Sequence, residues 1–145
     1  MRKKYVTKSD EETQHLGEDF SSSLTVGDVV LLYGNLGYGK TTFIKGLVKG
    51  LGGRRRVVSP TFVVMRTYVL ENKKGIKRIY HADLYRIENS EKLSGIGLDE
   101  KISDPEAIVV IEWPEAIEKL PGKRWEVKIE MSNQNTRTFN ILEHD

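Results

Sequence analysis

A glycine-rich segment at residues 34–41 constrains the fold of this chain more than any other feature. Its sequence is GNLGYGKT, which matches the pattern G-x-x-x-x-G-K-[ST]. Residues 29–33 before it form a continuous apolar run, and residues 43–51 after it carry apolar side chains at helical spacing. Gly52-Gly53 then ends the helical pattern. A buried strand, a tight turn and an amphipathic helix are therefore predicted in this order.

Each residue type in this segment suits the binding of phosphate. Glycines at positions 34, 37 and 39 allow the backbone N–H groups to turn inward around an anion. The Lys40 ammonium can reach the β and γ phosphates, and the Thr41 hydroxyl can complete a Mg²⁺ site. The N-terminus of a helix beginning near Lys40 favours an anion further. Nucleotide binding is the function that this pattern predicts.

The rest of the chain predicts a P-loop NTPase-like, three-layer α/β fold with a mixed parallel/antiparallel sheet, in one domain over residues 1–145. Ser9 and Glu12 have the spacing of a capping box, so a helix is expected over residues 10–23. A short polar turn joins strand candidates 61–70 and 78–84, which favours an antiparallel hairpin. Residues 107–111 indicate another buried strand, and residues 125–131 and 137–142 alternate like a second hairpin.

Two acidic residues at predicted strand ends are candidates for the chemistry of phosphate transfer or hydrolysis. Glu112 follows an apolar strand, where a carboxylate would lie beside the phosphate loop as a metal ligand; a surface glutamate is the alternative. Asp83 ends the other strand and could either act in the site or cap a turn. Ser59, Pro60 and Thr61 lie where a segment that senses the γ-phosphate is often found, although an ordinary strand start has the same composition.

Composition narrows the possible classes of protein. The 145 residues carry 23 Lys and Arg against 21 Asp and Glu, a net charge of +2, which argues against a dedicated nucleic-acid binder. The absence of cysteine excludes disulfides, thiol nucleophiles and cysteine-based zinc sites. The longest apolar run is too short to cross a bilayer, and no apolar stretch of a secretory signal follows the basic start. A cytoplasmic protein without membrane association is expected.

The motifs, in their order and spacing behind the phosphate loop, resemble those of the bacterial TsaE (YjeE) family, the small ATPases of tRNA threonylcarbamoyladenosine biosynthesis. The resemblance covers nearly the whole chain. Besides the loop and its following Thr42, it rests on short segments spread along the sequence: Glu12-Thr13 with Leu16-Gly17, Ser59-Pro60-Thr61-Phe62, His81-Ala82-Asp83-Leu84-Tyr85-Arg86, Gly97-Leu98-Asp99-Glu100 and Glu112-Trp113-Pro114-Glu115.

The resemblance implies a Mg²⁺-dependent ATP hydrolase that is weak alone and works with the proteins TsaB and TsaD. In that family TsaB and TsaD place threonylcarbamoyl on adenosine 37 of tRNAs reading codons that begin with A, and the ATPase supports repeated turnover. Contact with tRNA would be indirect, through the complex. The implied roles are catalysis by Lys40 and Asp83, a switch at Ser59, Pro60 and Thr61, metal binding by Thr41 and Glu112, and ATP binding by Asp10, Thr13, Gly37, Tyr38, Gly39, Lys40, Thr41, Thr42, Trp113 and Glu115.

Two positions depart from the family pattern. Tyr38 stands where alanine is usual and could contact a partner or cover the nucleotide, and Ala82 stands where an aromatic residue is common. From Lys123 onward the chain matches only in pattern. A basic residue there, Arg137, could face the nucleotide, but the resemblance does not assign it.

Three other functions are compatible with a phosphate loop. A small-molecule kinase would need a lid carrying arginines, and Arg54-Arg55-Arg56 is better interpreted as a solvated or partner-facing patch. A regulatory GTPase would carry the pattern Asn-Lys-x-Asp, whereas Asn72-Lys73 is followed by Lys74-Gly75. A module that uses ATP only as an assembly signal is the third. Its hydrolysis would not respond to partner proteins.

Overall fold

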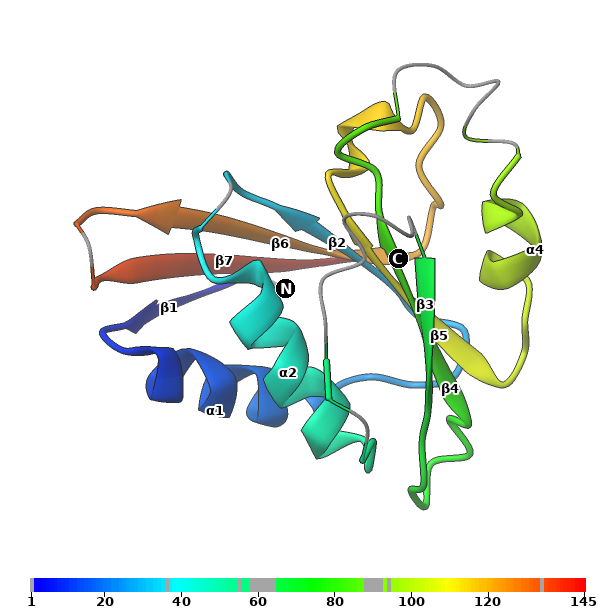
Figure 1. The fold of residues 1–145 in the computed structure, drawn as a ribbon, viewed down its shortest axis with the longest axis horizontal. Helices are drawn as coiled ribbons and strands as arrows, with labels where there is room; N and C mark the ends of the chain where they lie inside the picture. The colour runs from blue at the N-terminus through cyan, green and yellow to red at the C-terminus, as the bar shows by residue number, and fades with distance from the viewer. Residues whose placement is uncertain are drawn as a thin grey trace.

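The computed structural model describes residues 2–35, 37–54, 56–57, 65–87, 93, 95–133 and 135–145. These residues form a seven-stranded sheet with the order β1-β7-β6-β2-β5-β4-β3 and helices on both of its faces (Figure 1). Along the chain the elements are β1 (Arg2–Thr7), α1 (Asp10–Ser21), β2 (Val29–Tyr33), α2 (Lys40–Gly50), β3 (Met65–Val69), β4 (Arg78–Asp83), α4 (Leu98–Ile102), β5 (Ala107–Glu112), the short 3₁₀ turn η1 (Pro114–Ala116), β6 (Arg124–Met131) and β7 (Arg137–His144).

Four parallel strands make the centre of this sheet. β2 pairs in parallel with both β5 and β6, and β5 pairs in parallel with β4. The antiparallel pairs β3–β4, β6–β7 and β1–β7 complete the two sides. All six residues of β5 are buried, as expected of a strand covered on both faces. The fold is thus α/β with a mixed sheet, as the sequence predicts, and the carboxyl ends of β2, β4 and β5 meet at one edge.

Helices α1 and α2 cover one face of the sheet together (Figure 1). Ser9 caps α1 by accepting a hydrogen bond from the Glu12 N–H, 3.0 Å away, and Glu12 in turn accepts one from the Lys8 N–H. Two glycines let the helices approach closely. A Cβ on Gly17 would collide with the carbonyl oxygen of Phe43, and a Cβ on Gly46 with that of Gln14.

The β3–β4 hairpin is joined to the end of α1 through Lys74. Its Nζ donates hydrogen bonds to the carbonyl oxygens of Ser21, Ser22 and Leu24, at 3.2, 2.6 and 2.8 Å. The last turn of α1 carries no basic residue of its own. The Lys74 ammonium, 50 positions after Leu24, therefore satisfies these carbonyls at the end of α1 and interacts favourably with the helix dipole.

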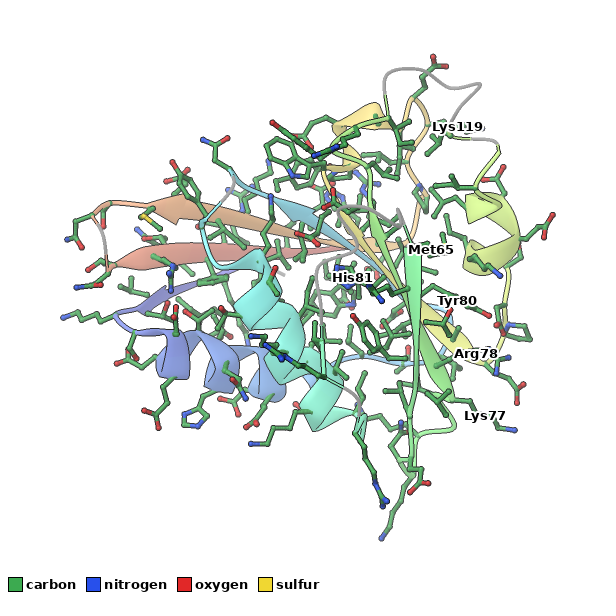
Figure 2. The ribbon with its side chains drawn as sticks, viewed as in Figure 1. Met65, Lys77, Arg78, Tyr80, His81 and Lys119 are labelled. Atoms are coloured by element: carbon green, nitrogen blue, oxygen red, sulfur yellow. The ribbon has the colours of Figure 1, made fainter. Side chains whose placement is uncertain are left out.

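The opposite face of the sheet packs against α4 and the residues that follow η1. Near the amino ends of β4 and β5, Asp104 accepts hydrogen bonds from Arg78 Nε at 2.7 Å and from Tyr80 at 2.6 Å. Figure 2 shows Arg78 and Tyr80 extending from β4 on this side of the sheet. The Arg78 guanidinium holds the pKa of the Asp104 carboxyl well below its usual range. This ion pair connects β4 to the start of β5.

The structure confirms the predicted elements with small differences in their ends, and it adds a strand, a helix and the short turn η1. α1 ends at Ser21 rather than at residue 23, α2 ends at Gly50 before Gly52 with its φ of 83°, and β5 includes Glu112. β3 begins at Met65, and residues 61–64 of the predicted strand lie outside the described residues. Strand β1 and the five-residue α4 were not expected. β1 carries no apolar alternation, because as an edge strand it has five exposed residues.

Candidate nucleotide-binding site

The glycine-rich loop joins the end of β2 to the start of α2, as the sequence predicts. Gly37 and Gly39 have φ values of 81° and 97°. Residues other than glycine rarely adopt this backbone conformation. Gly39 precedes the first residue of α2, and a Cβ at this position would lie 3.1 Å from the Cδ and Nε atoms of Arg137. The positive φ therefore favours glycine at position 39, and a side chain there would also displace the end of Arg137 slightly.

Lys40 is the first residue of α2 and is only 5% exposed, although its side chain ends in a charge. Its Nζ donates a hydrogen bond to the carbonyl oxygen of Gly34 and lies 4.1 Å from the centre of the Trp113 ring. Burial lowers the pKa of the ammonium, while the negative charges of Glu112, Asp83 and Glu115 act in the opposite direction. Lys40 is thus held at the edge of the sheet, close to the predicted acidic residues.

Glu112 and Asp83 lie side by side at the carboxyl ends of β5 and β4. Their Cα atoms are register partners, and the two residues are 3% and 8% exposed. The burial of Glu112 excludes the alternative of a surface glutamate. Burial raises the pKa of the Asp83 carboxyl, and the nearby charge of Glu112 raises it further. Asp83 also accepts a hydrogen bond from the Tyr85 N–H at 2.9 Å, so it both caps a turn and belongs to the acidic pair.

His81 belongs to this group of side chains, although the sequence patterns assign it no role. It is fully buried, and its Nε2 lies 2.7 Å from Glu112 Oε2. Alternation along β4 offers the signal that could have identified it, since residues 81 and 83 face the same side of a strand. Alternation could not identify Glu112 as the hydrogen-bond partner of His81, because the two residues are 31 positions apart in the sequence.

Trp113 and Glu115 follow β5 directly and lie at the same edge of the sheet. Trp113 has a φ of 56°, the only positive value of a non-glycine residue among the described positions. Its ring packs on that of Tyr85, with the centroids 4.9 Å apart, and its buried Nε1 lacks a hydrogen-bond partner within the described part of the chain. Such a backbone conformation costs free energy and is common at ligand sites. Glu115 is exposed, and its negative charge acts to raise the pKa of Lys40.

Asp10 and Thr13, the two N-terminal residues predicted to bind ATP, have different surroundings. Asp10 accepts a hydrogen bond at 2.8 Å from Arg137, whose side chain is 12% exposed and lies against Gly39. The structure thus brings Asp10 and Arg137 to the glycine-rich loop. Thr13 is fully buried, and its hydroxyl bonds with the Thr7 hydroxyl at 2.7 Å, so it lies beneath the surface of α1.

The remaining predicted residues are placed as follows. Thr41 and Thr42 lie in the first turn of α2 and are partly exposed. Tyr38 packs partly against the core beneath the helices, and its hydroxyl lies 3.4 Å from the Asn35 side-chain nitrogen. Ser59, Pro60 and Thr61 lie outside the described residues. The switch therefore stays a prediction.

The chemistry of these groups fits a magnesium nucleotide. The Thr41 hydroxyl and the Glu112 carboxylate are the hard oxygen ligands that Mg²⁺ prefers. No cluster of three acidic or histidine side chains suited to a metal occurs within the ranges that the structure describes.

A cavity of about 690 Å³ among the described residues lies elsewhere. It is an open groove between α1 and strands β1, β6 and β7, and its lining includes Tyr5, Leu16, Phe20 and Trp125. It contains no residue of the glycine-rich loop. The groups suited to phosphate, backbone N–H groups at a helix N-terminus and a lysine, lie instead at the loop. Among the described residues, no helix has the length and apolar character to cross a bilayer.

Comparison with known proteins agrees with this arrangement. A family model described as "Threonylcarbamoyl adenosine biosynthesis protein TsaE" matches residues 7–139. The chain is similar to proteins named "tRNA threonylcarbamoyladenosine biosynthesis protein TsaE" from Rickettsia bellii (36% identity, 94% of this chain and 92% of that protein), Bacillus subtilis (36%, 95% and 84%) and a Nostoc species (39%, 90% and 80%).

The fold is similar to a solved structure as well. The crystal structure of YdiB from Bacillus subtilis superposes with a TM-score of 0.80 at 30% identity, over 100% of this chain and 87% of that one. The residues matched by the family model include the loop, the acidic pair and the residues that follow β5. This chain therefore belongs to the TsaE family of threonylcarbamoyl adenosine biosynthesis proteins.

Proposed function

We propose that this protein binds and hydrolyses Mg²⁺-ATP and thereby supports repeated formation of threonylcarbamoyladenosine at adenosine 37 of tRNAs, acting with TsaB and TsaD. The observation that carries the ATPase part is the meeting of Lys40, Asp83 and Glu112 at one edge of the sheet, beside a glycine loop. Family membership carries the part in tRNA modification. We also infer that the protein acts in the cytoplasm.

Each residue of the site has a role in this proposal. The loop N–H groups and Lys40 bind the phosphates and compensate their charge, and Thr41 and Glu112 hold Mg²⁺. When bound, Mg²⁺ neutralises charge that develops on the phosphate oxygens. Asp83 accepts a hydrogen bond from the attacking water and orients it. Asp10, Thr42, Trp113 and Glu115 border the nucleotide, and Arg137 holds Asp10 against the loop.

Multiple-turnover reconstitution of the tRNA modification tests the proposal. Purified protein is combined with TsaB, TsaD, tRNA and their substrates, and both modified adenosine and released phosphate are measured. We expect slow hydrolysis by the protein alone, faster hydrolysis with the partners, and product beyond one turnover only when this protein is present. Lys40→Ala is the matched control and should abolish nucleotide binding and turnover.

The possible outcomes distinguish the alternative functions. Nucleotide binding without hydrolysis, even with both partners, would indicate an assembly module. Transfer of the γ-phosphate to a small molecule with no release of free phosphate would indicate a kinase. Unchanged tRNA modification when the protein is omitted would contradict its role in the pathway and leave the ATP site in place.

A further inference from the structure

His81 lies on β4 between the apolar core and the acidic pair, Asp83 and Glu112. Ile79, His81 and Asp83 alternate along β4 on the face that packs against α2, and Ile79 belongs to the core there. Figure 2 shows His81 on this side of the sheet and Tyr80 on the other. His81 has no exposed surface, and the Tyr68 ring lies 6.0 Å from its own. Its imidazole is therefore confined between the core and the carboxylates.

The hydrogen bond to Glu112 determines which ring nitrogen carries the proton. The carboxylate oxygen Oε2 can only accept, so Nε2, at 2.7 Å, donates. The other nitrogen, Nδ1, is buried and lacks a hydrogen-bond partner within the described residues. The arrangement thus places hydrogen on Nε2, the nitrogen that faces Glu112.

This bond has a consequence for the direction of the Glu112 carboxylate. The Nε2–H donor holds Oε2, and the bond leaves Oε1 for another partner. Lys40 and Asp83 both lie close enough to Glu112 to interact with its charge. A carboxylate free to rotate could pair with the Lys40 ammonium and remove it from the phosphates. Ligands of metals in proteins are commonly oriented by such outer hydrogen bonds.

We propose that His81 is the positioning residue of the metal-binding carboxylate, holding Glu112 through Nε2–H so that its other oxygen is directed to Mg²⁺. This inference rests on the proposed function, because Glu112 is a metal ligand only if Mg²⁺-ATP binds. His81 itself touches neither the nucleotide nor the metal in this arrangement. Loss of the His81 side chain weakens binding of the metal, while ATP without metal still binds.

Binding of Mn²⁺, a spectroscopic substitute for Mg²⁺, to the ATP complex tests this role. His81→Phe keeps the ring volume and removes the donor, whereas His81→Gln keeps an N–H near the position of Nε2. We expect His81→Phe to weaken Mn²⁺ binding, measured by electron paramagnetic resonance, by about 10- to 100-fold. His81→Gln should restore most of this loss. Both variants should bind ATP without metal as the wild type does.

Tyr80→Phe is the matched control. It removes the hydrogen bond to Asp104 on the opposite face of β4, so it disturbs the same strand without touching Glu112. Its Mn²⁺ affinity should equal that of the wild type. Wild-type affinity in folded His81→Phe, or no recovery in folded His81→Gln, overturns the positioning role alone. A wild-type protein that binds neither ATP nor Mn²⁺ overturns the proposed function and this inference with it.

The ring tautomer gives a second test that needs no substitution. Nitrogen-15 spectra of the wild-type protein without nucleotide show whether Nε2 carries hydrogen. We expect that it does. A ring with hydrogen on Nδ1 alone contradicts the proposal even if a His81 variant does not fold.

Discussion

Lys40, Asp83 and Glu112 are ionisable side chains buried at the edge of the sheet beside the phosphate loop, and their burial opposes folding. Lys40, Asp83 and Glu112 are at most 8% exposed. A buried charge is destabilising unless its partners compensate the lost hydration. Burial lowers the pKa of Lys40 and raises that of Asp83, so for both groups it favours the neutral form. We interpret this arrangement as stability given up for phosphate chemistry, a common feature of active sites.

Asp83→Asn should therefore make the protein more stable at pH 7 while it impairs ATP hydrolysis. The pKa of Asp83 is raised in the folded state, so its ionised form costs stability, and this cost grows as the pH rises from the unfolded pKa through the raised folded pKa. Asparagine is neutral and keeps the shape. Urea unfolding at pH 7 should show a higher midpoint for the variant, and the difference should shrink as the pH falls towards about 4, the unfolded value.

Asp104→Asn is a control for which the expected change in stability has the opposite sign. The pKa of Asp104 is lowered by Arg78, so its ionised form stabilises the fold, and that stability is lost only as the pH falls through the lowered pKa. This variant should be less stable than the wild type by the same amount at pH 6 and pH 8. A loss of stability in Asp83→Asn at pH 7 would contradict our account of the acidic pair.

At the scale of elements, the approach of α1 to α2 holds the phosphate loop in place. α2 begins at Lys40, and Gly17 and Gly46 let the two helices approach until backbone meets backbone. Arg137 then connects α1 to the loop from β7. The position of the loop thus depends on helix packing as well as on its own glycines.

Gly46→Ala should destabilise the protein, although alanine is the better helix former. The gain in helix propensity is about 1 kcal/mol. The added Cβ would collide with the backbone carbonyl of Gln14, which cannot move without shifting α1, and overpacking of this kind costs about 1–3 kcal/mol or more. We expect a net loss in the free energy of unfolding, measured by urea denaturation.

Gly122→Ala is the matched control for this substitution. A Cβ added to Gly122 would have no atom within 4 Å apart from those of its chain neighbours, and the φ of this residue is not positive. The substitution should change stability by less than about 0.5 kcal/mol. A Gly46→Ala protein as stable as this control would show that the helices can separate easily.

At the scale of the whole molecule, the proposed nucleotide site gathers residues from α1, α2, β4, β5 and β7. These elements are far apart in the sequence, since Asp10 and Arg137 are separated by 127 positions. A ligand that binds this site binds only the folded chain. Its binding energy therefore adds to the stability of the entire fold.

Mg²⁺-ATP at about 100 times its dissociation constant should raise the free energy of unfolding by about 2.7 kcal/mol. Thermal unfolding followed by circular dichroism, with a non-hydrolysable ATP analogue in place of ATP, measures the shift. The Lys40→Ala protein should show none. An equal shift in both proteins would place the nucleotide outside the phosphate loop.

The sequence itself determined the strand–loop–helix unit, the two hairpins, the central strand β5 and the acidic strand ends. Each depends on neighbours within about ten positions, through apolar periodicity, glycine turns or a terminal carboxylate. Strand β1, the capping of α1 by Lys74, and the contacts of His81 and Arg137 were decided only by the tertiary structure. These depend on pairing between distant segments, and the sequence pattern of a single segment carries no information about the partner that will lie beside it.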